Sequence, residues 1–183
     1  MSASSRQTKD QSAAHAGWPA SWRDVDGWDR FLKQRRIKLL FSLTLLLLFA
    51  RVVGLWFYPR LVIDEGLWTL EAKDLVLFKD RGLSGLQQFP RSPLHLSLLT
   101  MLFQLMPPTI FSARMLSVFF GVAAILLLWD HVRRPAGELA AFLAALLAGF
   151  CFGYLMINRH AYLESGVAFF SMLAIWASAR KER

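Results

Sequence analysis

The hydrophobic positions of this chain gather in long continuous blocks, separated by short polar segments. Apolar stretches of about twenty residues are typical of membrane-spanning helices, because a helix of that length crosses the hydrocarbon core of a bilayer. The blocks of this length lie at about Leu39–Tyr58, Ile110–Trp129, Leu139–Ile157 and Ala161–Ala179. The pattern therefore predicts an all-α fold, a polytopic transmembrane helical bundle with about four spans.

A single charged residue, Arg51, interrupts the first block. A charge inside a membrane is costly and is usually paired within the protein. We therefore expect Arg51 to pair with an acidic side chain inside the bundle.

The loop between the first two spans, residues 59–109, contains two further predicted helices. Asp64 suits the N-cap of an amphipathic helix whose apolar residues lie roughly along one side, at Leu67, Leu70, Leu75 and Phe78. A second apolar stretch, Ser92–Met106, is bounded by prolines and as a helix would extend about 23 Å, short of the roughly 30 Å hydrocarbon core. We interpret it as an interfacial or re-entrant helix in an outer loop.

Charge distribution gives the expected orientation. Basic residues mostly flank the apolar blocks, in the polar tail 1–36, in segment 131–134 and at the C-terminus. Four spans put these three groups on one side of the membrane, and the positive-inside rule makes that side cytoplasmic. We expect a multi-pass protein of the cell membrane, with a cytoplasmic tail (1–36), a transmembrane module (37–183) and both termini in the cytoplasm.

Composition excludes several classes of function. The chain is 55% hydrophobic and 19% charged, more apolar than soluble domains usually are. Its net charge of +8 does not form the basic polar domain that nucleic-acid binding requires, so no nucleic-acid partner is expected. The one cysteine, Cys151, excludes an internal disulfide.

The predicted topology brings acids, bases and an apolar surface to the non-cytoplasmic side. The acids are Asp64, Glu65 and Glu164; the basic candidates are Arg114, Arg159, His95 and His160. A carboxylate can deprotonate an acceptor hydroxyl, and a cation can stabilise a departing phosphate. Plainer roles remain open: Asp64 as a helix cap, Glu164 and the histidines as interfacial polar groups, and the arginines as interfacial anchors.

The order of four motifs resembles that of a known family. It comprises Asp-Glu-Gly-Leu-Trp (64–68), the proline-bounded segment, Ser-Ala-Arg-Met-Leu-Ser-Val-Phe-Phe-Gly (112–121) and Asn-Arg-His-Ala-Tyr-Leu-Glu (158–164). This order resembles the N-terminal membrane module of GT-C glycosyltransferases, which include protein O-mannosyltransferases and the lipid A aminoarabinose transferase. The resemblance covers about residues 37–183.

The resemblance implies roles for individual residues. Asp64 matches the first outer-loop acid and would be the catalytic base, with Glu65 positioning acceptor or donor. Glu164 matches the acid of the second outer loop, and Arg159, a few residues before it, would face the donor phosphate. Ser92-Pro93-Leu94-His95 stands where relatives commonly have Pro-Pro-Leu-Tyr, so His95 replaces an aromatic residue. No metal ligand set is predicted; the acidic loops could bind a divalent cation, but their scattered carboxylates define no site.

We thus expect a membrane glycosyltransferase, or the N-terminal part of one, that transfers a sugar from a polyprenyl-phosphate-linked donor to an acceptor on the non-cytoplasmic face. Family enzymes commonly have many more spans, so a second chain supplying the missing helices is a predicted partner, beside membrane lipid. The alternative is a non-catalytic four-helix membrane module or subunit that binds lipid or scaffolds a partner. A transporter fits less well, since the spans contain almost no ionisable residues.

Overall fold

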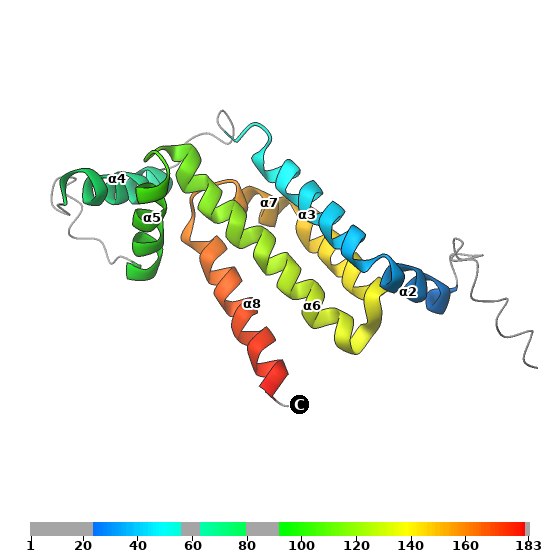
Figure 1. Ribbon diagram of the computed structural model, residues 1–183. Coiled ribbons are helices and arrows are strands. Elements are labelled where there is room, and N and C mark those ends of the chain that lie inside the picture. The colour runs from blue at the N-terminus through cyan, green and yellow to red at the C-terminus, as the bar shows by residue number, and fades with distance from the viewer. Residues whose placement is uncertain (1–23, 56–62, 80–91, 182–183) are drawn as a thin grey trace, which may run out of the picture.

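The computed structural model describes residues 24–55, 63–79 and 92–181, and in these ranges the fold is all-α, as predicted (Figure 1). The polar tail before residue 24 and the predicted far end of the first span at 56–58 lie outside the described residues. The helices are α2 (Val25–Gln34), α3 (Arg36–Val52), α4 (Ile63–Phe78), α5 (Pro93–Leu105), α6 (Ile110–Phe150), α7 (Phe152–Asn158) and α8 (Leu163–Lys181).

Helix α6 is a helical hairpin rather than one straight rod. Gly137 has φ +87° and ψ 174°, a conformation open essentially to glycine alone, and Figure 1 shows the chain turning back at the lower end of α6. Contacts across the turn confirm the reversal, because the Trp129 Nε1 donates to the Glu138 Oε2 at 3.2 Å and the Trp129 ring meets Phe142 edge-on. The predicted blocks 110–129 and 139–157 thus correspond to two antiparallel arms.

Helix α2 stabilises this turn through hydrogen bonds. The Asp29 Oδ1 accepts hydrogen bonds from the backbone N–H groups of Glu138, at 2.5 Å, and Leu139, at 3.1 Å. These N–H groups begin the second arm and have no carbonyl partner within it, so Asp29 acts as a helix cap from a distant element. A Cβ atom on Gly137 would lie 2.7 Å from the same oxygen, so a larger residue at this position would clash with Asp29.

The second arm ends earlier than the sequence predicts. Residue Cys151, with ψ 121°, separates α6 from α7, so the predicted continuous helix 139–157 is interrupted. Arg51 donates from Nη2 to the Gly149 carbonyl at 3.0 Å and from Nη1 to the Leu47 carbonyl at 3.3 Å. The expectation of an acidic partner for Arg51 is therefore wrong. The Gly149 carbonyl lies at a helix end, where carbonyls lack helical partners and carry partial negative charge, and it accepts a hydrogen bond from the buried guanidinium instead.

The core of the bundle lies where α3 packs against both arms of α6. Gly149 allows this close approach, since a Cβ there would lie 2.5 Å from a methyl group of Leu47. The buried apolar residues of this core are Leu43, Leu47, Leu55, Val118, Val122, Ile125, Trp129, Ala141 and Ala145. A second, smaller core joins α4 and α5 to the start of α6, through Ala72, Leu96, Leu99, Phe103, Ala113 and Ala161.

The buried side of α4 differs in part from the predicted one, although Leu75 packs against the second core. The helix itself is confirmed, but Asp64 lies inside its first turn rather than at the cap, and the buried residues are Glu65, Thr69, Glu71, Ala72 and Asp74. Of the predicted core side, Leu70 is 43% exposed and Phe78 61% exposed. The reason is that Glu65 turns toward Arg114, and Leu70 is left outside.

Length and apolar composition mark one described helix, α6, as able to cross a membrane. The pair α7 and α8, bent by 115° at its break, would add another if it forms one broken span. Helix α3 has 17 residues and ends at Val52, ahead of Gly54 with φ +70°. The predicted count of four spans is therefore not confirmed.

Candidate functional site

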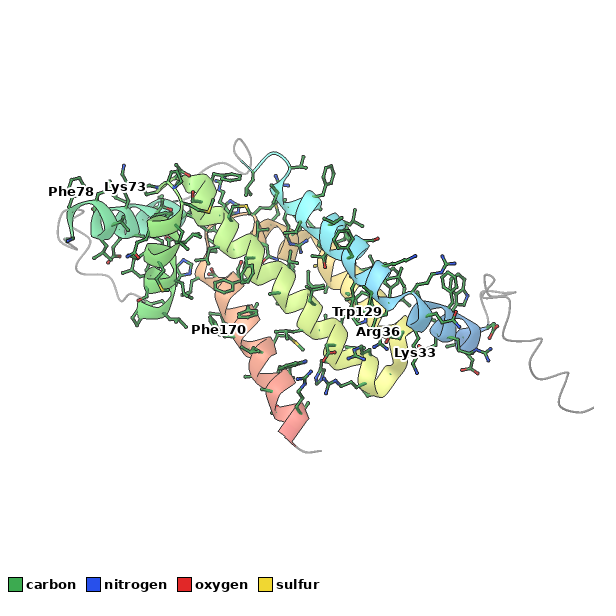
Figure 2. The ribbon with its side chains drawn as sticks, viewed as in Figure 1. Lys33, Arg36, Lys73, Phe78, Trp129 and Phe170 are labelled. Carbon is green, nitrogen blue, oxygen red and sulfur yellow. The ribbon has the colours of Figure 1, made fainter. Side chains whose placement is uncertain are left out.

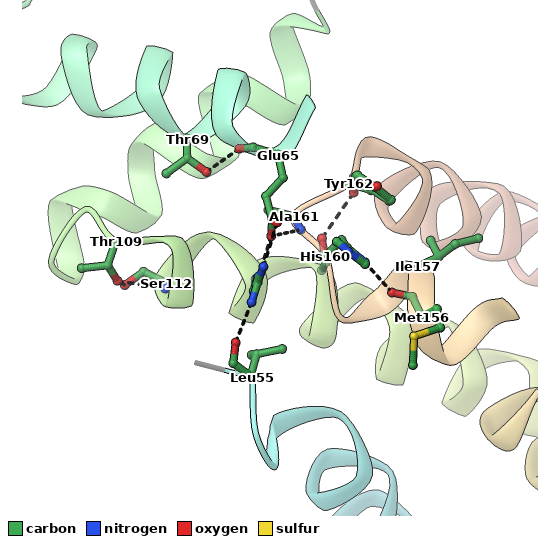
Figure 3. A network of polar contacts seen from close by, with 12 residues as sticks. Leu55, Glu65, Thr69, Thr109, Ser112, Met156, Ile157, His160, Ala161 and Tyr162 are labelled. Carbon is green, nitrogen blue, oxygen red and sulfur yellow. Dashed lines mark hydrogen bonds and ion pairs between the residues drawn. The ribbon is translucent and has the colours of Figure 1, made fainter. Parts of the chain in front are cut away.

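A buried ion pair lies where α4 meets α6 and the α7–α8 turn (Figure 3). The Glu65 Oε1 accepts a hydrogen bond from the Arg114 Nε at 2.6 Å, and the Glu65 Oε2 accepts one from the Arg114 Nη2 at 2.9 Å. Glu65 is 0% exposed and Arg114 2% exposed. This bidentate geometry is the strongest form of a carboxylate–guanidinium contact.

The pair connects four parts of the chain. The Glu65 Oε1 also accepts from the Ala161 N–H at 3.0 Å, in the turn between α7 and α8. The Arg114 Nη1 donates to the Leu55 carbonyl at 2.7 Å, just beyond α3. Glu65 and Arg114 therefore fix α4, α6, the α7–α8 turn and the end of α3 to one another. Two of the sequence candidates are thus brought together in a buried contact.

Arg159 holds the end of α3 in a similar way. Its Nη1 donates to the Ala50 carbonyl at 3.0 Å and its Nη2 to the Val53 carbonyl at 2.8 Å. A cation at the C-terminal end of a helix is favourable, because the last carbonyls carry partial negative charge. The guanidinium of Arg159 thus lies on the backbone of α3.

The negative charges of the three candidate acids all act on the phenol of Tyr162. Partial burial, followed by the negative charges of Glu65, Asp64 and Glu164, raises the pKa of Tyr162 above its ordinary value. Asp64 and Glu164 are exposed, whereas Glu65 is buried. The structure therefore brings acids from α4 and from the start of α8 to one end of the molecule, with two carboxylates open to solvent.

His160 supports the ring of Tyr162. The two rings stack with centroids 4.8 Å apart and planes 8° apart, while the His160 Nδ1 lies 3.0 Å from the Met156 carbonyl oxygen (Figure 3). Tyr162 was not among the residues to which the sequence analysis gave a role. Its position two residues before Glu164, in a short turn between apolar helices, was the signal available.

An apolar groove with a cavity volume of about 260 Å³ opens beside these acids, between α5 and α8. His95 lines it and is 3% exposed, and neither ring nitrogen has a hydrogen-bond partner. Burial lowers the pKa of His95, opposed by the negative charge of Glu164, so the ring favours its neutral form. The remaining lining residues are Ser92, Leu94, Leu98, Phe120, Leu163, Gly166, Val167, Phe170 and Ser171.

Local sequence explains why His95 faces this groove. Ser92 caps α5, accepting a hydrogen bond from the His95 N–H at 3.5 Å, and Pro93 occupies the first helical turn. The cap fixes the start of α5 and with it the direction of His95, whose ring also meets Trp68 edge-on at 5.7 Å. Among the described residues no group of three histidine, cysteine or acidic side chains is arranged to hold a metal ion.

A sequence profile of the dolichyl-phosphate-mannose-protein mannosyltransferase family matches residues 90–182. The chain belongs to this family. Membership in the dolichyl-phosphate-mannose-protein mannosyltransferase family makes it a membrane glycosyltransferase module of the GT-C type, as the motif order indicated. The matched region contains His95, Arg114, Arg159 and Glu164 and begins after Asp64. Neither the curated proteins nor the solved structures include a match to the chain.

Proposed function

We propose that the chain carries the reaction face of a membrane glycosyltransferase, which transfers a sugar from a polyprenyl-phosphate-linked donor to an acceptor hydroxyl on the non-cytoplasmic side. The observation that carries the proposal is that the negative charges of Asp64 and Glu164 both act on Tyr162, while an apolar groove lined by Leu163 opens next to Glu164. A lipid-linked sugar needs both features together: a carboxylate in water and an apolar surface at the membrane.

In this proposal Asp64 is the catalytic base. It is exposed and lies in the first turn of α4, which the Glu65–Arg114 pair holds in place. The carboxylate takes the proton of the acceptor hydroxyl, whose oxygen bonds to the sugar's anomeric carbon. The bond from that carbon to the phosphate oxygen breaks, and the polyprenyl phosphate leaves with the electron pair.

The groove between α5 and α8 supplies the donor site. Its walls of Leu98, Phe120 and Phe170 suit the first isoprene units of the lipid. The unpartnered ring of His95 offers a hydrogen bond to a polar group at the head of that chain. Glu65 and Arg114 act by positioning α4, and Arg159 by positioning the end of α3.

The proposed topology has four spans: α3, the two arms of α6, and α8. The bonds from Glu65 to Arg114 and Ala161 support a shared compartment for loop 59–109 and turn 158–164. With basic residues at the opposite end, this arrangement puts both termini in the cytoplasm.

The test is sugar transfer in membranes supplied with polyprenyl-phosphate sugars, comparing the unaltered chain with Asp64→Asn. Loss of a general base typically lowers the rate by about 10²- to 10⁴-fold. Asp26→Asn, which removes an exposed carboxylate from α2, is the matched control and should keep full turnover. Equal turnover of Asp64→Asn and the unaltered chain would rule out Asp64 as the base, and a chain that transfers no sugar from any such donor would contradict the proposed function.

A further inference from the structure

A second groove, with a cavity volume of about 440 Å³, lies between α3 and the first arm of α6. Its walls are mainly apolar, and charged groups stand at one end only. The hydroxyl of Thr44 is turned to the Leu40 carbonyl at 2.7 Å and does not interrupt the apolar surface. The lining residues are Leu40, Phe41, Thr44, Leu126, Trp129, Asp130 and Arg133.

The charged end of this groove meets a basic depression. Residues 33–38, at the junction of α2 and α3, line a hollow of about 610 Å³ and include Lys33, Arg35, Arg36 and Lys38. Arg36 lies four residues before Leu40, hence one helical turn away on the same face. Arg36 and Trp129 also both bind Glu138, and Figure 2 shows Lys33 and Arg36 beside Trp129. The apolar groove and the basic hollow are therefore neighbours at the start of α3.

Positive charge in the hollow exceeds what the described residues neutralise. Arg36 pairs with Glu138, and Arg133 pairs with Asp130. Lys33 and Lys38 are exposed and form no ion pair with any residue that the structure describes. The first turn of α3 contains no acidic residue, although a helix N-terminus favours negative charge. A bound anion would be stabilised here.

We propose that this combined surface binds one anionic phospholipid. One acyl chain lies in the groove along Leu40, Phe41 and Trp129, and the phosphate of the headgroup lies against Lys33, Arg36 and Lys38. The apolar groove selects a lipid over a free anion, and the basic hollow selects an anionic over a zwitterionic headgroup. The site lies at the opposite end of the bundle from Asp64 and does not depend on the proposed transfer reaction.

The test is native mass spectrometry of the full chain in detergent, titrated with phosphatidylglycerol or phosphatidylcholine with the same acyl chains. We expect one phosphatidylglycerol to bind at least about tenfold more tightly than phosphatidylcholine. The double variant Lys33→Gln/Lys38→Gln should lose this preference. Lys73→Gln/Lys79→Gln removes the same charge from exposed lysines of the α4 segment and should keep it (Figure 2).

Two further measurements separate the groove from the charge. Thr44→Phe fills the apolar groove without altering charge and should weaken binding of phosphatidylglycerol. Free glycerol phosphate should compete poorly, because it has no acyl chain. Equal binding of the two lipids, equal losses in the two double variants, or competition by glycerol phosphate as strong as by the lipid would overturn the proposal.

Discussion

Removing one partner of the Glu65–Arg114 pair should destabilise the whole fold, because the remaining charge stays buried. In Glu65→Gln the side chain keeps its shape but loses its charge, and the guanidinium of Arg114, 2% exposed, loses both of its carboxylate contacts. Breaking a buried ion pair by removing one partner costs about 3–5 kcal/mol. At roughly 2–4 °C per kcal/mol for a chain of this size, the melting temperature should fall by about 6–20 °C.

The assay is thermal unfolding in detergent, followed by the fluorescence of the native tryptophans. Arg114→Met should cost a similar amount. The double variant Glu65→Gln/Arg114→Met should be less damaging than the two single changes combined, with a favourable coupling of about 2 kcal/mol or more, because no buried charge is left. Glu164→Gln is the matched control: it neutralises an exposed carboxylate at the same end and should change stability by less than about 0.5 kcal/mol.

Strictly additive losses, or a melting temperature for Glu65→Gln within a degree of the control, would refute the reasoning. So would a Glu65→Gln protein that melts normally and has lost sugar transfer. That result would give Glu65 a role in the chemistry, in place of the positioning role that its buried contacts indicate.

Three other changes test separate parts of the structure. Gly137→Ala should destabilise the fold by about 2 kcal/mol or more, because the residue has a positive φ and the added Cβ would clash with Asp29. Gly153→Ala, with open space around it, should not destabilise the fold, and thermal unfolding compares the two variants. Asp29→Ala should cost about 1 kcal/mol through the lost cap, and Asp26→Ala, exposed on the same helix, should cost little. Because the pKa of His95 is lowered in the folded state, the free energy of unfolding should be full above pH about 6.5 and should fall as the pH drops through that value. His95→Phe should reduce this pH dependence, which thermal unfolding at several pH values would measure.

Local signals predicted much of the helix content. Ser92 and Pro93 at the start, with Met106 and Pro107 at the end, gave α5 its bounds almost to the residue, since a cap and prolines act within one helical turn. The reversal near Gly137 was also accessible, because polar residues there separate two apolar blocks.

Features that depend on distant residues could not be predicted. The second arm of α6 ends just before Cys151, and the Gly149 carbonyl near this end accepts a hydrogen bond from Arg51. Arg51 belongs to α3, about a hundred residues earlier in the chain. The burial of Glu65 on α4 depends on Arg114, so the hydrophobic pattern of this helix predicted its buried side only in part. In the candidate site, the sequence identified the acids whose charges act on Tyr162, while the stacking of Tyr162 on His160 depends on the conformation of the α7–α8 turn and could not be predicted.

The contacts of Glu65 limit how substrates can reach the acids. One carboxylate bonds both to Arg114 on α6 and to the backbone of the α7–α8 turn, so neither outer segment can swing away alone without stranding a buried charge. A lid built from α4 is therefore disfavoured. In the proposed reaction, substrate would instead enter through the opening between α5 and α8, and the surrounding residues are already in place before any ligand arrives.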